Sequence, residues 1–146
     1  MTLQTLIERC LAKQGAYLDF PFGPSPLCAR IGKRIFAEIS LTRPWVTLKC
    51  EPVYGQMLRH KYPETIRRGY HCPPPQHPYN NTITLDGTVP DEELCAMIDH
   101  SYDRALAALT RAQRAEALER TADAVDPASF VMAEEAQPEA ASNHHS

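Results

Sequence analysis

The sequence lacks the features that mark membrane, secreted and disulfide-bonded proteins. No apolar run approaches the roughly 18 residues of a membrane span. The N-terminal segment has neither the cationic start nor the apolar centre of a signal peptide. The cysteines are scattered, odd in number and without a CxxC pair, so we expect small core residues rather than disulfides; they are Cys10, Cys28, Cys50, Cys72 and Cys95. These absences predict a cytoplasmic protein.

Catalytic signatures are also missing. There is no GxGxxG or GxxxxGK[ST] phosphate loop and no GxSxG nucleophile elbow. The acidic run at 91–93 follows Pro90 at a predicted helix start, where carboxylates favour the positive end of the helix dipole. His71, Cys72 and His77 lie close together, but their spacing fits no standard zinc pattern. We therefore expect no enzymatic activity, no cofactor and no metal.

Length and charge divide the chain into two parts. We predict one domain over residues 1–120 and a disordered, acidic, Ala- and Pro-rich tail over 121–146. From Met1 to Arg114 there are 14 Lys and Arg against 11 Asp and Glu; from Ala115 onward there is one Arg against seven acids. The net charge between Arg30 and Arg68 is +6. This basic centre is compatible with nucleic-acid contact, although an ordinary solvated surface has the same composition.

Apolar spacing predicts four helices. Residues 2–13 repeat apolar side chains at the helical period, with Thr2 as N-cap. Pro52 begins a second helix that ends before Pro63, and Pro90 opens a third. Thr110 and Gln113 form a possible capping box for a fourth helix that extends to about residue 120.

The stretch from Leu27 to Lys49 predicts three antiparallel strands. Apolar and polar residues alternate in runs at 27–31, 34–40 and 45–49, which is typical of half-buried strands. Gly32 and Lys33 fit the two-residue loop of a type II′ hairpin. This alternation assigns Ile35, Ala37 and Ile39 to the core, and Phe36 and Glu38 to the opposite face.

Two further strands are predicted at 66–71 and 81–86. Prolines and glycine exclude regular structure from Ala16 to Pro26, and the segment from Cys72 to Pro78 is expected to be an extended surface loop. The resulting order, α-β(3)-α-β(2)-α, predicts an α+β fold whose antiparallel sheet carries helices on one face.

The other face of the sheet is the candidate functional surface. It combines cations, which neutralise phosphates, with aromatic rings, which stack on unpaired bases. The candidate nucleic-acid-binding residues are Arg30, Lys33, Arg34, Trp45, Lys49, Arg67, Arg68, Tyr70 and Tyr79. Two alternatives stay open: Phe36 and Trp45 can pack beneath the stems of Arg30 and Lys49, or the exposed face can form a homodimer interface, where aromatics and Arg are enriched.

Five collinear segments resemble the MmcQ/YjbR family of small bacterial proteins. They are FPFGP (20–24), ARIGKRIFAEI (29–39), VTLKCEP (46–52), TITLDGTVPDEEL (82–94) and IDHSYDRAL (98–106). No single segment is a chemical signature, and the specificity of the resemblance lies in their order and spacing. The resemblance covers residues 2–114 and leaves the acidic tail outside.

The resemblance implies a compact α-β(3)-α-β(2)-α fold similar to CyaY-like proteins and type III secretion chaperones. It also implies DNA binding through paired β wings, because members of the family are commonly named DNA-binding proteins. Where many relatives carry Trp just before the last strand, this chain has Asn80, so an aromatic role there either passes to Tyr79 or is lost. We expect weak, non-specific DNA binding through a basic β-hairpin surface. The alternative is a chaperone-like homodimer.

Overall fold

The computed structural model describes residues 1–69 and 72–120. The predicted disordered tail and Tyr70 lie outside these ranges. Elements follow in the order α1 (Leu3–Leu11), β1 (Tyr17–Asp19), β2 (Leu27–Ile31), β3 (Arg34–Ile39), β4 (Trp45–Lys49), α2 (Pro52–Lys61), β5 (Ile66–Arg68), the 3₁₀ helix η1 (Pro74–Tyr79), β6 (Asn80–Thr84), α3 (Asp91–Ala107) and α4 (Arg111–Leu118).

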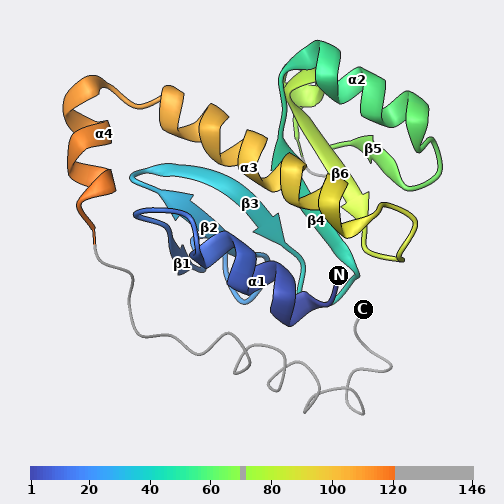
Figure 1. The fold of residues 1–146 in the computed structure, drawn as a ribbon, viewed down its shortest axis with the longest axis horizontal. Coiled ribbons are helices and arrows are strands. Elements are labelled where there is room, and N and C mark those ends of the chain that lie inside the picture. The colour runs from blue at the N-terminus through green and yellow to red at the C-terminus, as the bar shows by residue number, and fades with distance from the viewer. Residues whose placement is uncertain (70–71, 121–146) are drawn as a thin grey trace.

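The six described strands form one antiparallel sheet in the order β1-β2-β3-β4-β6-β5. The predicted meander β2-β3-β4 lies at its centre (Figure 1). The β2–β3 hairpin has a two-residue loop, since Ile31 pairs with Arg34. Gly32 has a φ of 58° and Lys33 has no positive φ, as the predicted type II′ turn requires.

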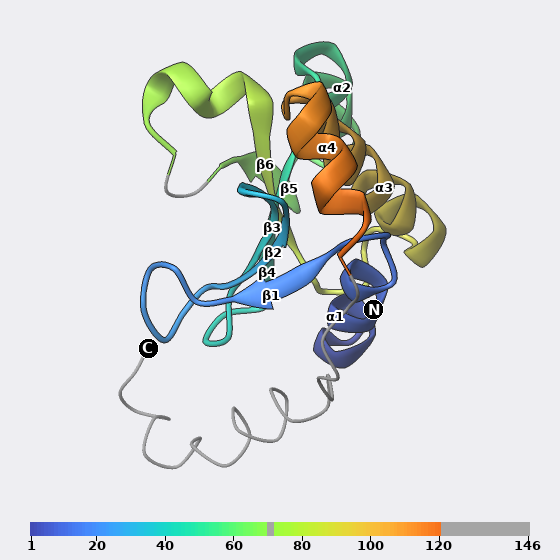
Figure 2. The ribbon, with the colours of Figure 1, turned by 90° about the vertical axis from the view of Figure 1, so that its left-hand side faces the viewer.

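All four described α-helices lie on one side of the sheet, as the sequence predicts (Figure 2). The other side carries no α-helix among the described residues, and we call it the open face. The loop between β1 and β2 and the η1 segment both project on the side of the open face (Figure 2). The α+β architecture is therefore confirmed.

Local capping explains where the helices begin. The Thr2 hydroxyl accepts from the Thr5 N–H at 3.1 Å. The Glu51 carboxylate accepts from the N–H groups of Val53 and Tyr54 before α2. Thr110 and Gln113 form the predicted capping box of α4. These side chains satisfy N–H groups that have no partner within the helix.

A β-bulge in β3 makes one part of the predicted register wrong. Ala29 pairs with Ala37 and Arg30 pairs with Ile35, so β3 carries Phe36 as an extra residue. Phe36 consequently turns to the helix side, where it is buried and packs edge-to-face against Tyr102 with ring centroids 5.4 Å apart. Ile35 is only half-buried, on the open face with Arg30.

Two loop predictions are also wrong. Tyr17–Asp19 forms strand β1, because the prolines begin only at Pro21 and leave the N–H groups of this segment free to pair. Within 72–78, residues from Pro74 onward belong to the 3₁₀ helix η1 rather than to an extended loop. The φ that proline imposes suits a 3₁₀ turn as well as an extended chain, and the Gln76 N–H donates to the Pro73 carbonyl at 2.8 Å.

The core lies between the sheet and the helices. One buried cluster contains Leu6, Ile7, Ala37, Ile39, Val46, Leu48, Ile83, Ile98 and Tyr102, and Leu3 and Leu85 pack against it. The assignment of Ile35 to the core is wrong, because the extra residue in β3 leaves Ile35 on the open face. Within the described ranges, every helix is too short or too polar to cross a bilayer.

Candidate nucleic-acid interface

The open face has a polar floor. Strand pairing places Glu38 opposite Thr47, Thr47 opposite Thr82, and Thr82 opposite Arg67, so these side chains form a row across four strands. The hydroxyls of Thr47 and Thr82 lie 2.8 Å apart and share a hydrogen bond. Val46 and Leu48, the alternate residues of β4, point to the buried side. The alternation that builds the core therefore also places this polar row on the opposite face, where Glu38, Thr47 and Arg67 are half-buried and Thr82 is buried.

Trp45 lies at one end of the open face, and two guanidinium groups contact its ring. The Arg67 guanidinium carbon is 4.5 Å from the indole centroid, and that of Arg43 is 5.5 Å away. Trp45 pairs with Thr84, whose hydroxyl accepts from Arg67 Nη1 at 3.3 Å. The half-buried indole thus holds two cations through cation–π contact.

A hollow of about 270 Å³ lies beside Trp45. Its lining joins the β1–β2 loop, the turn before β4 and the floor of the sheet, through Ser25, Pro26, Glu38, Ser40, Thr42, Arg43, Trp45 and Thr47. Ser25 ties the loop to that turn, because its hydroxyl accepts from the Leu41 N–H at 3.2 Å. The hollow offers hydroxyls, one guanidinium, one carboxylate and an aromatic ring to a polar ligand.

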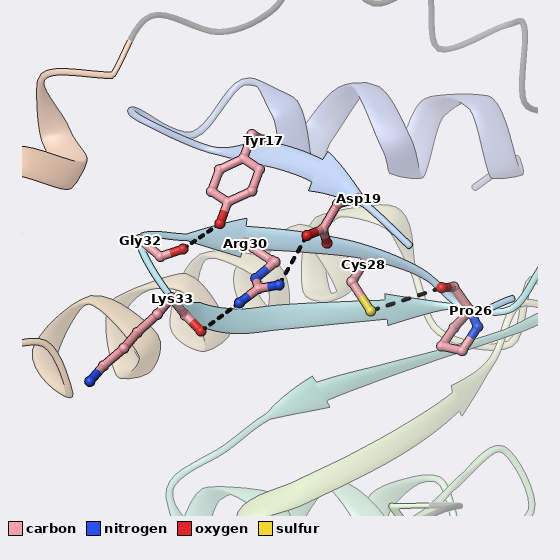
Figure 3. Close-up of polar contacts among 7 residues, drawn as sticks. All are labelled: Tyr17, Asp19, Pro26, Cys28, Arg30, Gly32 and Lys33. Atoms are coloured by element: carbon pink, nitrogen blue, oxygen red, sulfur yellow. Dashed lines mark hydrogen bonds and ion pairs between the residues drawn. The ribbon is translucent and has the colours of Figure 1, made fainter. Parts of the chain in front are cut away.

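Arg30 lies on the open face but is held by internal contacts (Figure 3). Its Nη1 contacts Asp19 Oδ2 at 2.9 Å and its Nη2 donates to the Lys33 carbonyl at 3.0 Å. The guanidinium carbon also lies 6.0 Å from the Tyr17 ring centroid. Arg30 therefore braces the β2–β3 turn against β1.

The two cations of the β2–β3 hairpin differ in position. Lys33 is exposed at the turn, and Figure 3 shows its side chain pointing away from the strands. Arg34 precedes the bulge and lies on the helix side, where its Nη2 donates to the Ala108 carbonyl at 3.4 Å. That carbonyl belongs to the C-cap of α3, the negative end of the helix dipole. The prediction that Arg34 lies on the open face is wrong.

Lys49 is half-buried near the other end of β4, where it pairs with Asn80. Burial lowers the pKa of its ammonium group, and the nearby Glu38 carboxylate opposes that effect. Its backbone N–H donates to the Ser101 hydroxyl of α3 at 2.8 Å, which anchors this end of β4 to the helix layer.

The remaining candidates lie toward the β5 edge. Arg68 is exposed but pairs opposite Asn81, which accepts from Arg59 of α2, so Arg68 belongs to the helix side. Tyr79 ends η1 with 43% of its surface exposed, and its carbonyl accepts from the Cys50 N–H. Tyr70 lies outside the described residues. The structure thus unites Trp45 with Arg67 and separates both from Arg34 and Arg68.

Cys28, which lies on the open face, is unsuited to thiol chemistry. The residue is buried and its Sγ lies 3.9 Å from the Pro26 carbonyl oxygen (Figure 3). Burial raises the pKa of the thiol to about 12, with a further contribution from Glu38. The thiolate, which is the nucleophilic form, is therefore scarce near neutral pH.

Sequence reasoning missed three residues of this surface. Arg43 precedes Trp45 by two positions, a spacing that places neighbouring extended residues on one face, but Pro44 between them obscures the strand pattern. Phe20 and Phe22 lie in a segment for which the sequence predicts no regular structure, and 41% and 64% of their surfaces are exposed. Nothing in the local sequence distinguishes an anchoring ring from an exposed one.

The fold and this surface define a small α+β protein with an antiparallel sheet covered by helices on one face. The YjbR family model matches residues 11–104, and the chain belongs to the YjbR family. The protein YjbR of Escherichia coli strain K12, described as uncharacterized, is 28% identical over 116 residues, which span 78% of this chain and 95% of the relative. The YjbR protein of Escherichia coli O157:H7 gives the same figures.

Two solved structures share the fold. The Deinococcus radiodurans protein DR2400, described as a DUF419 domain, superposes with a TM-score of 0.73 and 31% identity, covering 82% of this chain and 89% of its own. A Pseudomonas syringae protein superposes with a TM-score of 0.61 and 20% identity, covering 72% of this chain and 99% of its own. At that identity the second likeness concerns the fold alone.

Proposed function

We propose that this protein binds DNA weakly and without sequence specificity through the open face of its sheet. The observation that carries the proposal is the placement of Arg43 and Arg67 around Trp45, on the side of the sheet that no described α-helix covers. Guanidinium groups neutralise phosphates and form bidentate hydrogen bonds with them. The proposed role is binding without a chemical step, in the cytoplasm of a bacterial cell.

The charge balance of the open face supports weak binding. Arg43 and Arg67 add positive charge, whereas Asp19 is already paired with Arg30. Glu38 lies in the floor of the sheet and repels phosphates. The small positive excess attracts a polyanion at low salt and is screened at physiological ionic strength, where the Debye length is about 8 Å.

The absence of specificity follows from the helices. α3, the longest described helix, begins with three acidic residues at 91–93 and packs along β2, β3 and β4. A helix that reads bases in the major groove presents polar and basic side chains to the groove instead. Contacts from the open face therefore reach the phosphate backbone, which carries no direct sequence information.

A salt titration tests this proposal. Affinity for a duplex of mixed sequence, measured by fluorescence anisotropy, is expected to fall with salt at a log–log slope of about −2 to −3, since each phosphate contact contributes about −0.9. Replacing both Arg43 and Arg67 by Ala should reduce the slope by about two. The matched control replaces Arg68 and Arg111, which are exposed away from the open face, and removes the same charge. If the protein binds neither duplex nor single-stranded DNA at about 50 mM salt, the proposal is refuted.

A second candidate is a protein-interaction module that forms a chaperone-like homodimer through the open face. The exposed rings of Phe20 and Phe22 on the β1–β2 loop favour it, because aromatic residues are enriched in interfaces. Light scattering at several protein concentrations separates the two functions. A dimer that dissociates when both rings are replaced by Ala supports the second candidate, and a monomer that binds DNA supports the first.

A further inference from the structure

Two segments project on the side of the open face, and both carry exposed aromatic rings. The loop over residues 20–26 and the η1 segment extend away from the helix layer (Figure 2). Phe20 and Phe22 belong to the loop, and Tyr79 ends η1. Covering an exposed aromatic ring with a ligand is favourable, because it removes apolar surface from water. Their position beside a cationic surface indicates a ligand with both phosphates and flat apolar faces.

The loop and the cationic surface form one site. Ser25 and Pro26 of the loop line the same hollow as Arg43 and Trp45. The hydrogen bond from the Leu41 N–H to the Ser25 hydroxyl fixes the loop against the turn that carries Arg43. A strand whose phosphates meet Arg43 therefore passes close to the loop that presents the two phenylalanines.

The aromatic side chains of the site have two different roles. Arg67 and Arg43 lie near the indole of Trp45, so this ring holds the guanidinium groups in place. Phe22 is the most exposed ring of the two segments, with 64% of its surface accessible, and Phe20 presents 41% of its surface on the same loop. A duplex keeps its base faces stacked inside, whereas a single strand exposes them.

We propose that the open face prefers single-stranded nucleic acid, with unpaired bases stacked on Phe20 and Phe22 and phosphates at Arg43 and Arg67. This inference rests on the proposed function and names its ligand class. Charge alone favours the duplex, since a single strand releases fewer counterions for each phosphate contact, with about −0.7 against −0.9 in the salt slope. Tighter binding of the single strand than of the duplex would therefore have to come from base stacking.

The test compares a labelled oligothymidine of about 20 nucleotides with a duplex of equal length, by fluorescence anisotropy at about 50 mM salt. We expect the oligothymidine to bind at least fivefold more tightly, because one stacked base contributes a factor of about five or more. Trp45 is the single tryptophan, so a change in intrinsic fluorescence on binding reports the open face directly.

Replacing both Phe20 and Phe22 by Ala should reduce affinity for oligothymidine by about fivefold or more and leave duplex affinity within twofold. The matched control replaces Val53 and Met57, which are exposed apolar residues of α2 on the helix side, and should change neither affinity. Thermal denaturation of each variant verifies its fold.

The outcomes separate the two proposals. If neither ligand binds, the proposed function fails and the preference fails with it. If the duplex binds as tightly as oligothymidine or more tightly, the preference is overturned while the proposed function stands. If oligothymidine is preferred but the Phe20 and Phe22 variant keeps that preference, the assignment of stacking to the β1–β2 loop is overturned.

Discussion

Substituting Phe36 and Ile35 separately tests the β-bulge on which the arrangement of both sheet faces depends. Phe36 is buried against Tyr102 at an interplanar angle of 87°, whereas Ile35 is half-buried on the open face. Replacing a buried Phe by Ala costs about 3–5 kcal/mol, which includes the cavity and the lost ring pair. Replacing Ile35 by Ala should cost about 1 kcal/mol, because full burial of such a side chain contributes about 1.5–3 kcal/mol.

Urea denaturation followed by circular dichroism measures both costs. With a slope of about 2 kcal/mol per molar urea, the midpoint should fall by about 1.5–2.5 M for Phe36→Ala and by about 0.5 M for Ile35→Ala. The first loss is a large share of the 5–15 kcal/mol that stabilises a typical domain. Phe36→Leu therefore serves as a milder variant, expected to cost about 1 kcal/mol through the aromatic pair.

An Ile35→Ala loss equal to or greater than that of Phe36→Ala would refute the bulge. It would mean that the simple alternation of β3 holds through residue 35. In that register Phe36 and Arg34 return to the open face, and the predicted basic hairpin surface gains both side chains.

Two further predictions concern the acidic tail and the loss of stability at low pH. Truncation after Arg120 removes five Asp and Glu and no Lys or Arg. The melting temperature should stay within about 2 °C, because changes away from packed surfaces cost little stability. Duplex affinity at low salt should rise if the tail competes with DNA for the basic surface. The N–H groups of Tyr54 and Val53 lower the pKa of the Glu51 carboxyl, so its stabilising effect is complete above pH 4.5 and is lost as the pH falls below that value. Glu51→Gln should therefore lower the melting temperature at pH 7 and reduce its further fall on acidification.

Local interactions account for what the sequence predicted correctly. Thr2 and the Thr110–Gln113 pair act within one helical turn, so the residues that define these helix starts are adjacent in the chain. The alternation in β2 and β4 predicts their faces because neither strand carries the extra residue of the bulge. In β3, by contrast, the side chain that fills the space against Tyr102 is selected by packing between distant segments. Ile35 and Phe36 are both apolar, and period two cannot distinguish them.

In the candidate site, too, the sequence predicts residue types but not the contacts between distant segments. Trp45 and Arg67 were both recognisable as surface residues of interest, but their contact passes through β6, which pairs with Trp45 through Thr84 and with Arg67 through Thr82. Sequence spacing alone cannot predict this contact. Arg30 shows the converse, because a cation that suits phosphate binding by type is held by Asp19 within the fold.

The distribution of polarity across the open face favours a polyanion over a second copy of the chain. A stable protein interface has an apolar core and a polar rim. The floor here is polar, with the Thr47–Thr82 hydroxyl pair and Glu38 in one row, and the exposed rings of Phe20 and Phe22 lie on a projecting loop. The Thr47–Thr82 pair is already satisfied, but a homodimer that covered this face would also enclose the Glu38 carboxylate, at a desolvation cost larger than its repulsion of a hydrated phosphate strand. In the proposed complex the bases would cover the exposed rings and water would remain at Glu38, since nucleic-acid interfaces are wet and polar.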